Sequence, residues 1–496
     1  MKKIQSALIS VFDKTGIDKI ARKLHKNNIH IISTGGTQKH IESLNIPVTS
    51  VESLTDYPSI LGGRVKTLHP KIFGGILFRD DHSEDLEEIK KYNLPKIDLV
   101  IVDLYPFGET VKLTEDESEI IEKVDIGGVS LLRASAKNYS KTLVVSSRNN
   151  YNEFISYMEK NNYSTDINFR KKYASKAFGI TSEYDSQIDS FFGVSSGEYP
   201  QLRYGENPHQ KAIFKGDLGK IFDKINGKDL SYNNLLDINS AIRLISEFKS
   251  TTFAIIKHNN ACGIASCDTV LSSYKKALIS DPLSAFGGVL ITNEKVDEDS
   301  ANEINKLFFE VLIAPEFDDK SLDILKEKRN RIILRMNNFI LDKLSSKKLL
   351  GGYLQQDLDT AENKVENWSI VTETKPSNEQ IVDLEFANKI VKHSKSNAIV
   401  LVKGNQMISS GVGQTSRVDA LKHAIEKAKT FGFKVEGSVM ASDAFFPFPD
   451  CIEIASNAGV HSVVQPGGSI KDNLSIDTCN KAKISMVITG MRHFYH

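Results

Sequence analysis

The chain has 496 residues, of which 40% are hydrophobic and 25% are charged, the balance of an ordinary globular protein. Its 63 Lys and Arg residues match its 63 Asp and Glu residues, which argues against a protein that coats nucleic acid, because such proteins are usually strongly basic. The length predicts about three domain-sized units. No run of about 18 apolar residues occurs in the sequence, so we expect no membrane span.

The cysteines and the N-terminal residues indicate the compartment. None of the four cysteines forms a Cys-x-x-Cys pair and no Cys/His set has zinc-finger spacing, so we expect free thiols in a reducing cytosol and no bound metal. The opening "MKKIQSALISVFDK" has two lysines and then a short apolar run, which Gln5 and Ser6 interrupt. A signal peptide needs a longer run and a cleavage site, so this segment is predicted to be a β-strand and the location cytoplasmic.

Strands and helices alternate in the first third of the chain. The predicted helices have apolar residues at helical spacing, and the predicted strands are short apolar runs. The strands are predicted at 6–12, 29–33, 46–51, 97–107 and 141–147, with helices at 16–28 and 38–45. This alternation predicts an α/β unit with a parallel sheet, whose ligands bind beyond the carboxyl ends of the strands.

The stretch "STGGT", Ser33–Thr37, follows the second predicted strand. Hydroxyls, bare backbone N–H groups and a helix N-terminus can together hold a phosphate, although a simple Gly-Gly turn is an equally good interpretation. Lys14, Asp125–Gly128 and the helix that carries Lys137 are predicted to approach the same edge of the sheet. These positions form one candidate anion site.

A basic, glycine-rich segment, "LGGRVKTLHPKIFGGIL" at 61–77, belongs to the same candidate site. Arg64 and Lys66 lie beside glycines rather than among other polar residues, which disfavours a merely solvated basic loop. Arginine suits oxyanions through its planar guanidinium, and lysine can place a point charge where negative charge develops. Together with Thr67, these residues are predicted to meet the part of the ligand beyond its phosphate.

The pattern restarts after a break near 190–203. From there to His496, two α/β stretches of similar size contain "TTFAIIKHNNACG" with "SAFGGVLITN", and "SNAIVLVKGNQMISSGVGQTSR" with "SDAFFPFPD". Each is interpreted as strand, helix and strand followed by a Ser-Ala-Phe or Ser-Asp-Ala-Phe turn, a pattern compatible with an internal duplication. A looser tract at roughly 320–376 separates the two stretches.

Lys257 and His258 end an apolar strand in the stretch "IIKHNNACG". The neighbouring cation disfavours protonation of the imidazole, and a neutral histidine can accept a proton as a general base. A lone histidine at a strand end more often makes a structural hydrogen bond, and the adjacent lysine favours the functional alternative. "SGVGQTSR", which ends at Arg417, again suits a phosphate, whereas Phe445 and Phe446 are better explained as core.

Motifs of one family occur in order along nearly the whole chain. They are "STGGT", "LGGRVKTLHP", "DLYPF", "DIGGVSLLRASAKN", "LRYGENPHQ", "KHNNACG", "DPLSAFGG", "SNAI", "GVGQTSR", "SDAFFPF" and "RHFYH". The chain resembles the bifunctional enzymes that combine aminoimidazole-carboxamide ribonucleotide (AICAR) formyltransferase with inosine monophosphate (IMP) cyclohydrolase. It departs from the family pattern at Ala261, where Pro is more usual, and at Asp103, where Asn is common.

The resemblance implies the fold and the partners. Residues 1–195 are expected to form a cyclohydrolase domain with a methylglyoxal-synthase-like parallel sheet. Residues 196–496 are expected to form a transformylase domain of two cytidine-deaminase-like α/β subdomains, roughly 200–375 and 376–496, without the catalytic zinc. A homodimer with transformylase sites at its interface is also implied, with nucleotide and folate substrates and no nucleic-acid or membrane partner.

The resemblance further implies two reactions and their residues. A formyl group moves from the co-substrate 10-formyltetrahydrofolate to AICAR, and the formylated product (FAICAR) closes to IMP with loss of water. The residues implied in catalysis are Lys257, His258 and Asn397 for formyl transfer, and Lys66, Tyr105, Asp125 and Lys137 for ring closure. Those implied to bind IMP or FAICAR are Lys14, Ser33, Thr34, Gly35, Gly36, Thr37, Arg64, Thr67, Asp103, Ile126, Gly127 and Gly128. Those implied to bind AICAR are Arg203, Tyr204, Gly287, Glu310 and Arg417, and those implied to lie along the folate are Phe445, Asp450, Ser469 and Arg492.

Two alternatives belong to other classes of protein. A phosphate-eliminating lyase of the methylglyoxal-synthase type would use only the N-terminal resemblance and leave about 300 residues without a role. A nucleotide-sensing regulatory protein would bind without turnover, and the Lys257–His258 strand end together with Lys137 argues against it.

Overall fold

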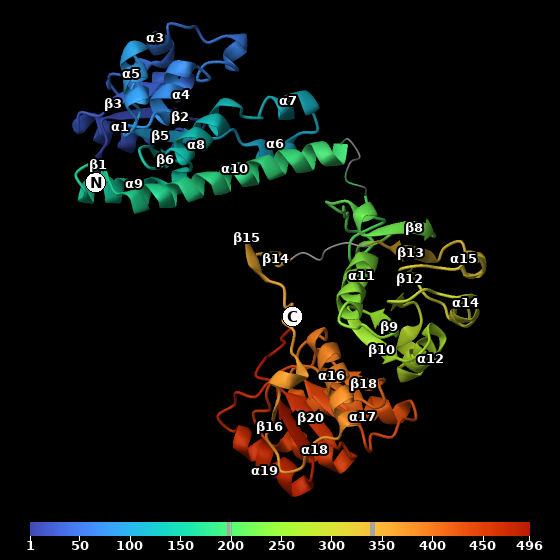
Figure 1. Ribbon diagram of the computed structural model, residues 1–496. Helices are drawn as coiled ribbons and strands as arrows, with labels where there is room; N and C mark the ends of the chain where they lie inside the picture. The colour runs from blue at the N-terminus through green and yellow to red at the C-terminus, as the bar shows by residue number, and fades with distance from the viewer. Residues whose placement is uncertain (196–198, 200, 338–342) are drawn as a thin grey trace. The chain divides into compact units, whose positions relative to one another are not determined.

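The computed structural model describes residues 1–195, 199, 201–337 and 343–496 of the chain. The chain forms two compact units, Met1–Glu198 and Tyr199–His496 (Figure 1). Each of the hydrophobic clusters found among the described residues lies wholly within one unit. The expected boundary between residues 195 and 196 adjoins 196–198 and 200, which lie outside the described residues.

The first unit contains the predicted parallel sheet. Its five strands have the order β4-β3-β2-β5-β6, and every neighbouring pair is parallel. The strands are β2 (Ser6–Val11), β3 (His30–Ser33), β4 (Thr49–Ser50), β5 (Leu99–Asp103) and β6 (Leu143–Val145), while β1 (Lys2–Lys3) pairs separately with β7 (Ser164–Thr165). Alternate side chains of these strands enter two different cores, because successive residues point to opposite faces. The sheet is therefore buried on both sides.

The helices of the first unit cover both faces of this sheet. One core contains residues of α1 and α9, and the opposite core contains residues of α3, α4 and α8; α10 contributes to both. The helices are α1 (Ile17–Lys26), α2 (Gly35–Glu42), α3 (Val51–Thr55), α4 (Pro70–Leu77), α5 (Ser83–Lys91), α6 (Phe107–Leu113), α7 (Glu117–Ile121), α8 (Gly127–Lys137), α9 (Tyr151–Lys160) and α10 (Ile167–Ser195). The predicted α/β class is confirmed for this unit.

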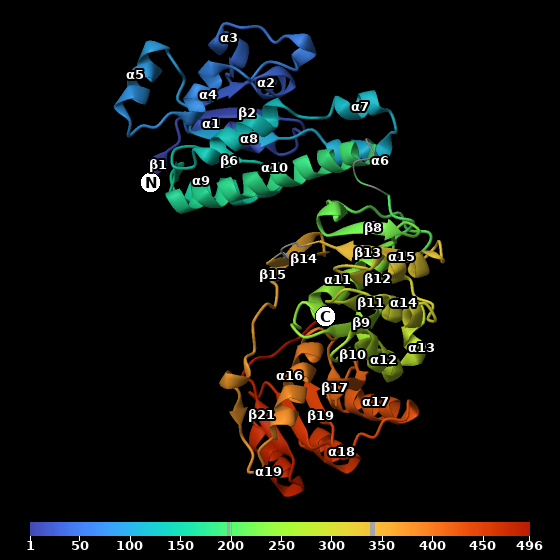
Figure 2. The same ribbon diagram turned by 45° about the vertical axis from the view of Figure 1, so that its right-hand side comes forward.

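The second unit contains two six-stranded mixed sheets (Figure 2). The first has the order β10-β9-β11-β12-β13-β8, from β8 (Phe222–Asn226), β9 (Thr252–Lys257), β10 (Asn260–Ser266), β11 (Val289–Thr292), β12 (Val311–Ala314) and β13 (Ile332–Met336). The second has the order β18-β17-β19-β20-β21-β16, from β16 (Ser369–Ile370), β17 (Ile399–Val402), β18 (Met407–Gly411), β19 (Val439–Ser442), β20 (Ser462–Gln465) and β21 (Ser485–Ile488). A separate hairpin joins β14 (Leu344–Leu349) and β15 (Gly352–Asp357).

The two sheets repeat one topology. Each sheet has five pairs of neighbouring strands. In the orders given above, these pairs are antiparallel, antiparallel, parallel, parallel and antiparallel in both sheets. This supports the internal duplication that the sequence suggested. The motifs used to detect it are not equivalent, however, because "SAFGG" precedes β11 whereas "SDAFF" begins at the end of its counterpart β19.

Helices cover both sheets of the second unit. They are α11 (Tyr232–Ile245), α12 (Val270–Ser280), α13 (Pro282–Ala285), α14 (Glu298–Ile304), α15 (Asp319–Lys326), α16 (Asn378–Lys392), α17 (Arg417–Thr430), α18 (Asp450–Ala458) and α19 (Asp472–Ala482). A shared core contains residues of α11, α16 and both sheets, so the two repeats form one body. Over the described ranges, no helix is both long and apolar enough to cross a membrane.

Candidate functional site

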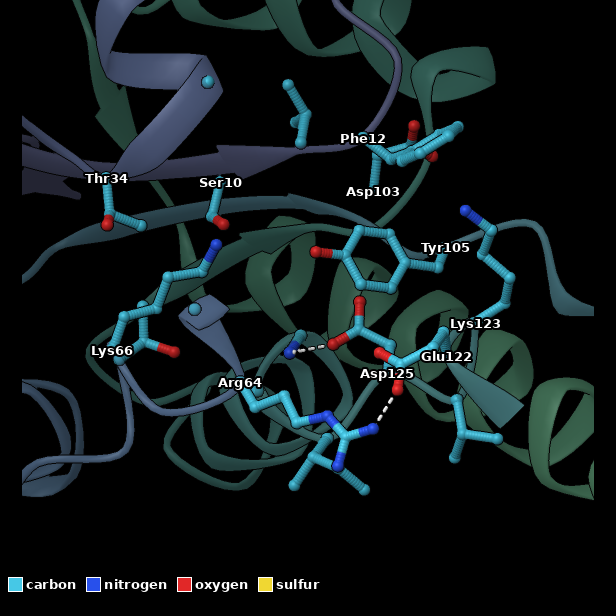
Figure 3. Close-up of a pocket in the computed structure, with 18 of the residues that line it drawn as sticks. Ser10, Phe12, Thr34, Arg64, Lys66, Asp103, Tyr105, Glu122, Lys123 and Asp125 are labelled. Atoms are coloured by element: carbon cyan, nitrogen blue, oxygen red, sulfur yellow. Dashed lines mark hydrogen bonds and ion pairs between the residues drawn. The ribbon is translucent and has the colours of Figure 1, made fainter. Parts of the chain in front are cut away.

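A pocket of about 690 Å³ opens in the first unit at the carboxyl ends of β2, β3 and β5 (Figure 3). It brings together residues that are far apart in the sequence, as the parallel sheet predicted. Its lining includes most of the expected nucleotide residues: Lys14, Thr34, Gly36, Thr37, Arg64, Lys66, Thr67, Asp103, Tyr105, Asp125, Ile126, Gly127 and Gly128.

One wall of the pocket is the N-terminus of α2. Thr34 is the N-cap residue, but its side chain donates to Glu52 Oε1 at 2.9 Å and does not cap the helix amides. Gly35 has a φ of 55°, and a Cβ added there would lie 3.5 Å from Lys66 Nζ. Lys14 Nζ, which donates to the carbonyls of Val11 and Phe12, would lie 3.8 Å from a Cβ on Gly36. Two ammonium groups thus flank uncapped helix amides, an arrangement suited to a phosphate.

Ser33 does not line this pocket. Its hydroxyl is buried and donates to the Ile9 carbonyl at 2.7 Å, which fixes the end of β3 to β2. Thr37 is likewise committed to the sheet, because its Oγ1 donates to the Val11 carbonyl at 2.9 Å and accepts from the Val11 amide at 3.1 Å. The predicted cradle is therefore formed by the backbone and the lysines more than by these hydroxyls.

The opposite wall carries Asp125 and Tyr105. Asp125 Oδ1 accepts from the Gly128 amide at 2.7 Å, and the Asp125 amide donates to Tyr184 Oη at 2.8 Å. Burial raises the pKa of Asp125, against the opposing effect of its backbone hydrogen bonds and of Lys66. Burial and the nearby Asp125 charge raise the pKa of Tyr105. Figure 3 shows these two side chains next to each other, across the pocket from Lys66. A cation thus faces two groups that can hold or move protons.

The rim of the pocket contains charged residues that the sequence did not single out. Arg64 forms an ion pair with Glu122 from the opposite side of the rim, and Lys123 lies beside it. Asp103 Oδ2 accepts from the Asp13 amide at 3.0 Å, a bond that the oxygen of a family-typical Asn could also accept. The sequence does not predict the Arg64–Glu122 ion pair, because the two residues meet only when α7 and the segments beside it fold.

The structure does not bring Lys137 to this pocket. It is the last residue of α8 and is exposed, whereas Gly127 at the start of the helix lines the pocket. A rise of about 1.5 Å per residue places the two ends of this helix about 15 Å apart. A shared helix predicted proximity, but the pocket lies at the N-terminus of α8 and Lys137 at its C-terminus.

The second unit places Lys257 and His258 at a tight turn between β9 and β10. His258 and Asn259 both have left-handed backbone angles, with φ of 50° and 64°, as a two-residue hairpin turn requires. Lys257 Nζ donates to the carbonyls of Phe286 at 2.9 Å and Gly287 at 3.1 Å. The predicted strand end is confirmed, and Gly287 lies beside Lys257 as a result of this contact.

The segment just before Asn397 contacts Asn260, the first residue after this turn. The Lys395 amide donates to Asn260 Oδ1 at 2.9 Å, which links the turn to the segment just before Asn397. Asn397 Nδ2 donates to the Gln414 carbonyl at 2.9 Å, which fixes the orientation of its amide. The structure therefore brings together the motifs "KHNN" and "SNAI", which are well separated in the sequence.

Arg417 joins the same neighbourhood. Its guanidinium forms an ion pair with the fully buried Asp443 at 2.9 Å, and Ser396 Oγ donates to the other oxygen of that carboxylate at 2.5 Å. The Arg492 guanidinium lies 4.4 Å from the centre of the Phe494 ring, which also lies 6.0 Å from the Arg417 guanidinium. The C-terminal motif therefore packs next to "GVGQTSR".

The other expected residues in this unit contact residues outside the Lys257–His258 turn. Glu310 pairs with Lys228 at 2.6 Å, Arg203 lies over the Tyr204 ring, and the Asp450 carboxylate binds the next amide. Ser469 Oγ accepts from the Lys471 amide at 3.1 Å. Phe446 is core, as expected, whereas Phe445 is only partly buried.

The side chains of the described residues contain no group of three or more His, Cys, Asp and Glu positioned to share a metal ion. All four cysteines are unpaired. Burial raises the pKa values of the Cys262, Cys451 and Cys479 thiols to about 12, so these thiols are neutral at ordinary pH.

Comparison with known families identifies both parts of the chain. A family model described as an MGS-like domain matches residues 16–130, and one described as the AICARFT/IMPCHase bienzyme matches residues 135–427. The chain belongs to the AICARFT/IMPCHase bienzyme family. As a member of this family, it is an enzyme that combines AICAR formyltransferase with IMP cyclohydrolase. A lyase that uses only the N-terminal unit does not account for the match over the second unit.

Relatives from distant bacteria match the chain over its whole length. A "Bifunctional purine biosynthesis protein PurH" of Bacteroides thetaiotaomicron is 55% identical over 100% of this chain and 99% of its own. Proteins of the same name from Acetivibrio thermocellus and Aquifex aeolicus are each 44% identical, over 99% of this chain and 100% of theirs. A solved structure, "Crystal structure of ForH", covers 39% of this chain and 100% of that one, at 31% identity and a TM-score of 0.34.

Proposed function

We propose that the two units divide the last two steps of IMP biosynthesis, with ring closure in residues 1–195 and formyl transfer in residues 196–496. The observation that carries this proposal is the composition of the pocket. All of its lining residues belong to the first unit, and they combine an anion cradle with a proton-handling wall. His258 and its neighbours belong to the second unit.

Ring closure joins the carboxamide nitrogen of FAICAR to its formyl carbon. The nitrogen attacks the formyl carbon and loses one proton, a C–N bond forms, and the formyl oxygen becomes an oxyanion that is protonated to a hydroxyl. The hydroxyl takes up a second proton and its C–O bond breaks to release water, while the formamide nitrogen loses its proton and a C=N bond forms. In our proposal the uncapped N-terminus of α2 and Lys14 hold the phosphate, and Lys66 stabilises the oxyanion. Asp125 and Tyr105 take the nitrogen proton and supply the proton that leaves with water, roles supported by their raised pKa values.

Formyl transfer needs a base because the amine of AICAR is a poor nucleophile, its lone pair being delocalised into the imidazole carboxamide. In our proposal, His258 accepts the amine proton as the nitrogen attacks the formyl carbon of 10-formyltetrahydrofolate. The bond from that carbon to N10 of the folate then breaks, and N10 takes up a proton as tetrahydrofolate leaves. Asn397 orients the formyl group, and Lys257 adjusts the charge of the site. Arg203, Tyr204, Gly287, Glu310 and Arg417 remain proposed nucleotide contacts, and Phe445, Asp450, Ser469 and Arg492 proposed folate contacts. The proximity of Asn260 to Lys395 supports a shared site for His258 and Asn397.

Fusion of the two activities follows from their energetics. Transfer to so weak an amine is thermodynamically poor, and the dehydrative closure draws it forward by mass action. The proposal includes a cytoplasmic homodimer and no catalytic metal. The four unpaired cysteines agree with a reducing compartment.

Two single variants of the whole chain test this division. His258→Ala is expected to lower formyl transfer by about 10²–10⁴-fold, the usual scale for a general base, and to leave closure of FAICAR unchanged. Lys66→Ala is expected to lower closure by about 10²–10³-fold, the scale for loss of an oxyanion donor, and to leave formyl transfer unchanged. Both reactions are measured on both proteins, with circular dichroism to check folding.

The control for charge removal is Lys90→Ala, at an exposed position of α5, which should change neither rate. Equal damage to both reactions by either folded variant would contradict the division between the units. Lys137→Ala is measured in the same series. Loss of ring closure in this variant would show that Lys137 takes part in the reaction despite its position at the far end of α8.

A further inference from the structure

The hairpin turn that carries His258 has a structural twin in the second repeat. β9 and β17 occupy the same place in their sheets, and so do β10 and β18. The turn after β9 has φ angles of 50° and 64° at His258 and Asn259, and the turn after β17 has 62° and 54° at Gly404 and Asn405. The two turns therefore have the same left-handed backbone.

A carboxylate on the preceding helix holds each turn. Asp237 Oδ1 accepts from the Asn259 amide at 2.7 Å, and the His258 amide faces the same carboxylate. In the twin, Asp383 accepts from the Asn405 amide at 2.7 Å and from the Gly404 amide at 2.8 Å. These carboxylates occupy equivalent places in α11 and α16, each of them six residues after the serine that caps the helix.

The lysine before each turn is matched as well. Lys257 Nζ binds the Phe286 and Gly287 carbonyls, and Lys403 Nζ binds the Glu436 carbonyl at 2.7 Å. A Cβ added to Gly287 or Gly437 would lie 3.4 Å or 3.2 Å from the corresponding ammonium. The two sites thus share a carboxylate, a lysine and a backbone, and they differ in having an imidazole at 258 and no side chain at 404.

The carboxylate of the first repeat has two tasks, to hold the turn and to act on the imidazole, whereas that of the second repeat has only the first. Holding a left-handed turn is needed in both repeats, because each turn places at least one non-glycine residue in that sterically costly conformation. Only the first repeat has an imidazole on the turn that the carboxylate binds. We propose that Asp237 is a positioning residue for formyl transfer, which fixes the turn that presents His258 and supplies the negative charge facing its imidazole, whereas Asp383 only fixes its turn. This inference rests on the proposed role of His258 as the base.

The surroundings of Asp237 support a charge effect. Burial raises its pKa, while hydrogen bonds from the turn and the charges of His258 and Lys257 oppose that rise. The charged groups near the turn are Asp237 on α11, Lys257 at the end of β9 and Lys395 before β17. The Lys257 ammonium is bound to backbone carbonyls, and the Lys395 ammonium lies 3.8 Å from the centre of the Tyr495 ring. Asp237 is the one anion among these three groups, and the charge of His258 is one of those that act on it.

The decisive measurement is the pH profile of kcat/KM for formyl transfer by the whole chain carrying Asp237→Asn, with Asp383→Asn as the matched control. Asn keeps the size of the side chain and an accepting oxygen but loses the charge. A neighbouring carboxylate favours the protonated imidazole. Its loss is expected to move the acid limb to lower pH and to lower the plateau. Asp383→Asn should leave the limb in place, and both variants should close FAICAR normally.

An unmoved acid limb in folded Asp237→Asn, or equal shifts in the two variants, would overturn the inference. Neither result touches the proposed function, which depends on whether His258→Ala abolishes formyl transfer.

If Asp237→Asn does not fold, the twin provides the test. A Cβ on Gly404 would meet nothing within 4 Å, and its φ matches that of His258, so Gly404→His can be accommodated. The NMR titration midpoint of the introduced imidazole should fall when Asp383→Asn is added. An unchanged midpoint would overturn the charge effect.

Discussion

Asp125 shows how one side chain of the closure site is fixed by its neighbours. The Gly128 amide donates to the Asp125 carboxylate, and the Asp125 amide donates to the hydroxyl of Tyr184 from α10. A Cβ on Gly128 would lie 2.5 Å from Asp125 Oδ2 and 2.9 Å from Leu104 Cδ2, closer than real Cβ contacts. Glycine is therefore required here for the carboxylate to reach the helix N-terminus.

Gly128→Ala is accordingly expected to displace the Asp125 carboxylate and to lower the rate of FAICAR closure by about 10²-fold, the cost of an error of about 1 Å in positioning. Formyl transfer should be unaffected. The matched control is Gly179→Ala, in the middle of α10, where a Cβ meets nothing within 4 Å. That change should leave closure intact and stabilise the helix by up to about 1 kcal/mol. A normal closure rate for Gly128→Ala, measured under single-turnover conditions, would mean that Asp125 does not need this geometry.

At the scale of an element, the N-terminus of α2 is suited to a phosphate. Its first amides are not capped by a side chain, and Lys14 and Lys66 flank them from two different loops. Burial lowers the pKa of Lys14, although the charges of Asp103 and Asp13 oppose that effect. A phosphate would supply the negative charge that these amides and ammonium groups face.

Lys14→Ala should therefore raise the KM for FAICAR in ring closure by about 10–100-fold, the equivalent of one charge-assisted hydrogen bond, with a smaller change in kcat. It should also weaken inhibition of closure by inorganic phosphate. Lys19→Ala, an exposed position on α1, removes the same charge outside the pocket and should change neither quantity. If phosphate inhibits closure no more than an inert salt does, and equally in the unchanged chain, Lys14→Ala and Lys19→Ala, a specific phosphate site on α2 is contradicted.

The sequence predicted elements better than it predicted the direction of side chains. The apolar strands and their polar carboxyl ends were sufficient to place Lys14, Thr34 and Asp125 near one edge, because a parallel sheet collects such ends. It could not show that Ser33 turns into the sheet or that Lys137 lies a whole helix away from the pocket. Those outcomes depend on rotamers and on helix direction.

Asp237 was missed for a related reason. In the sequence it is one acidic residue outside every motif singled out, 22 positions before Asn259, whose amide it binds. Only the packing of α11 against β9 and β10 brings the carboxylate to the turn. The duplicated topology supplies what the sequence lacks, since the same contact at Asp383 identifies the arrangement as a recurring part of the fold.

At the scale of the molecule, the two repeats of the second unit are joined by a shared core and by a partly buried ion pair. Lys427 on α17 of the second repeat lies 2.6 Å from Asp281 between α12 and α13 of the first, with side chains 21% and 2% exposed. Burial alone would raise the pKa of Asp281, but hydrogen bonds from Lys427 and Ser284 outweigh it and the pKa is lowered. The folded state therefore binds this proton less tightly than the unfolded state.

Such a carboxyl stabilises the fold above its unfolded pKa, about 4, and the contribution is lost as pH falls through the lower folded pKa. Lys427→Met should cost about 3 kcal/mol at pH 7, because it leaves a buried charge without its partner, and the cost should shrink as Asp281 takes up a proton in acid. Trp368, the chain's one tryptophan, packs against the shared core and can report urea unfolding by fluorescence. The control is Lys320→Met, which breaks an exposed pair with Glu298 on the same unit and should cost less than about 1 kcal/mol at either pH. A cost for Lys427→Met as small as that of the control, or one that is the same at pH 4 and pH 7, would show that this pair does not hold the two repeats together.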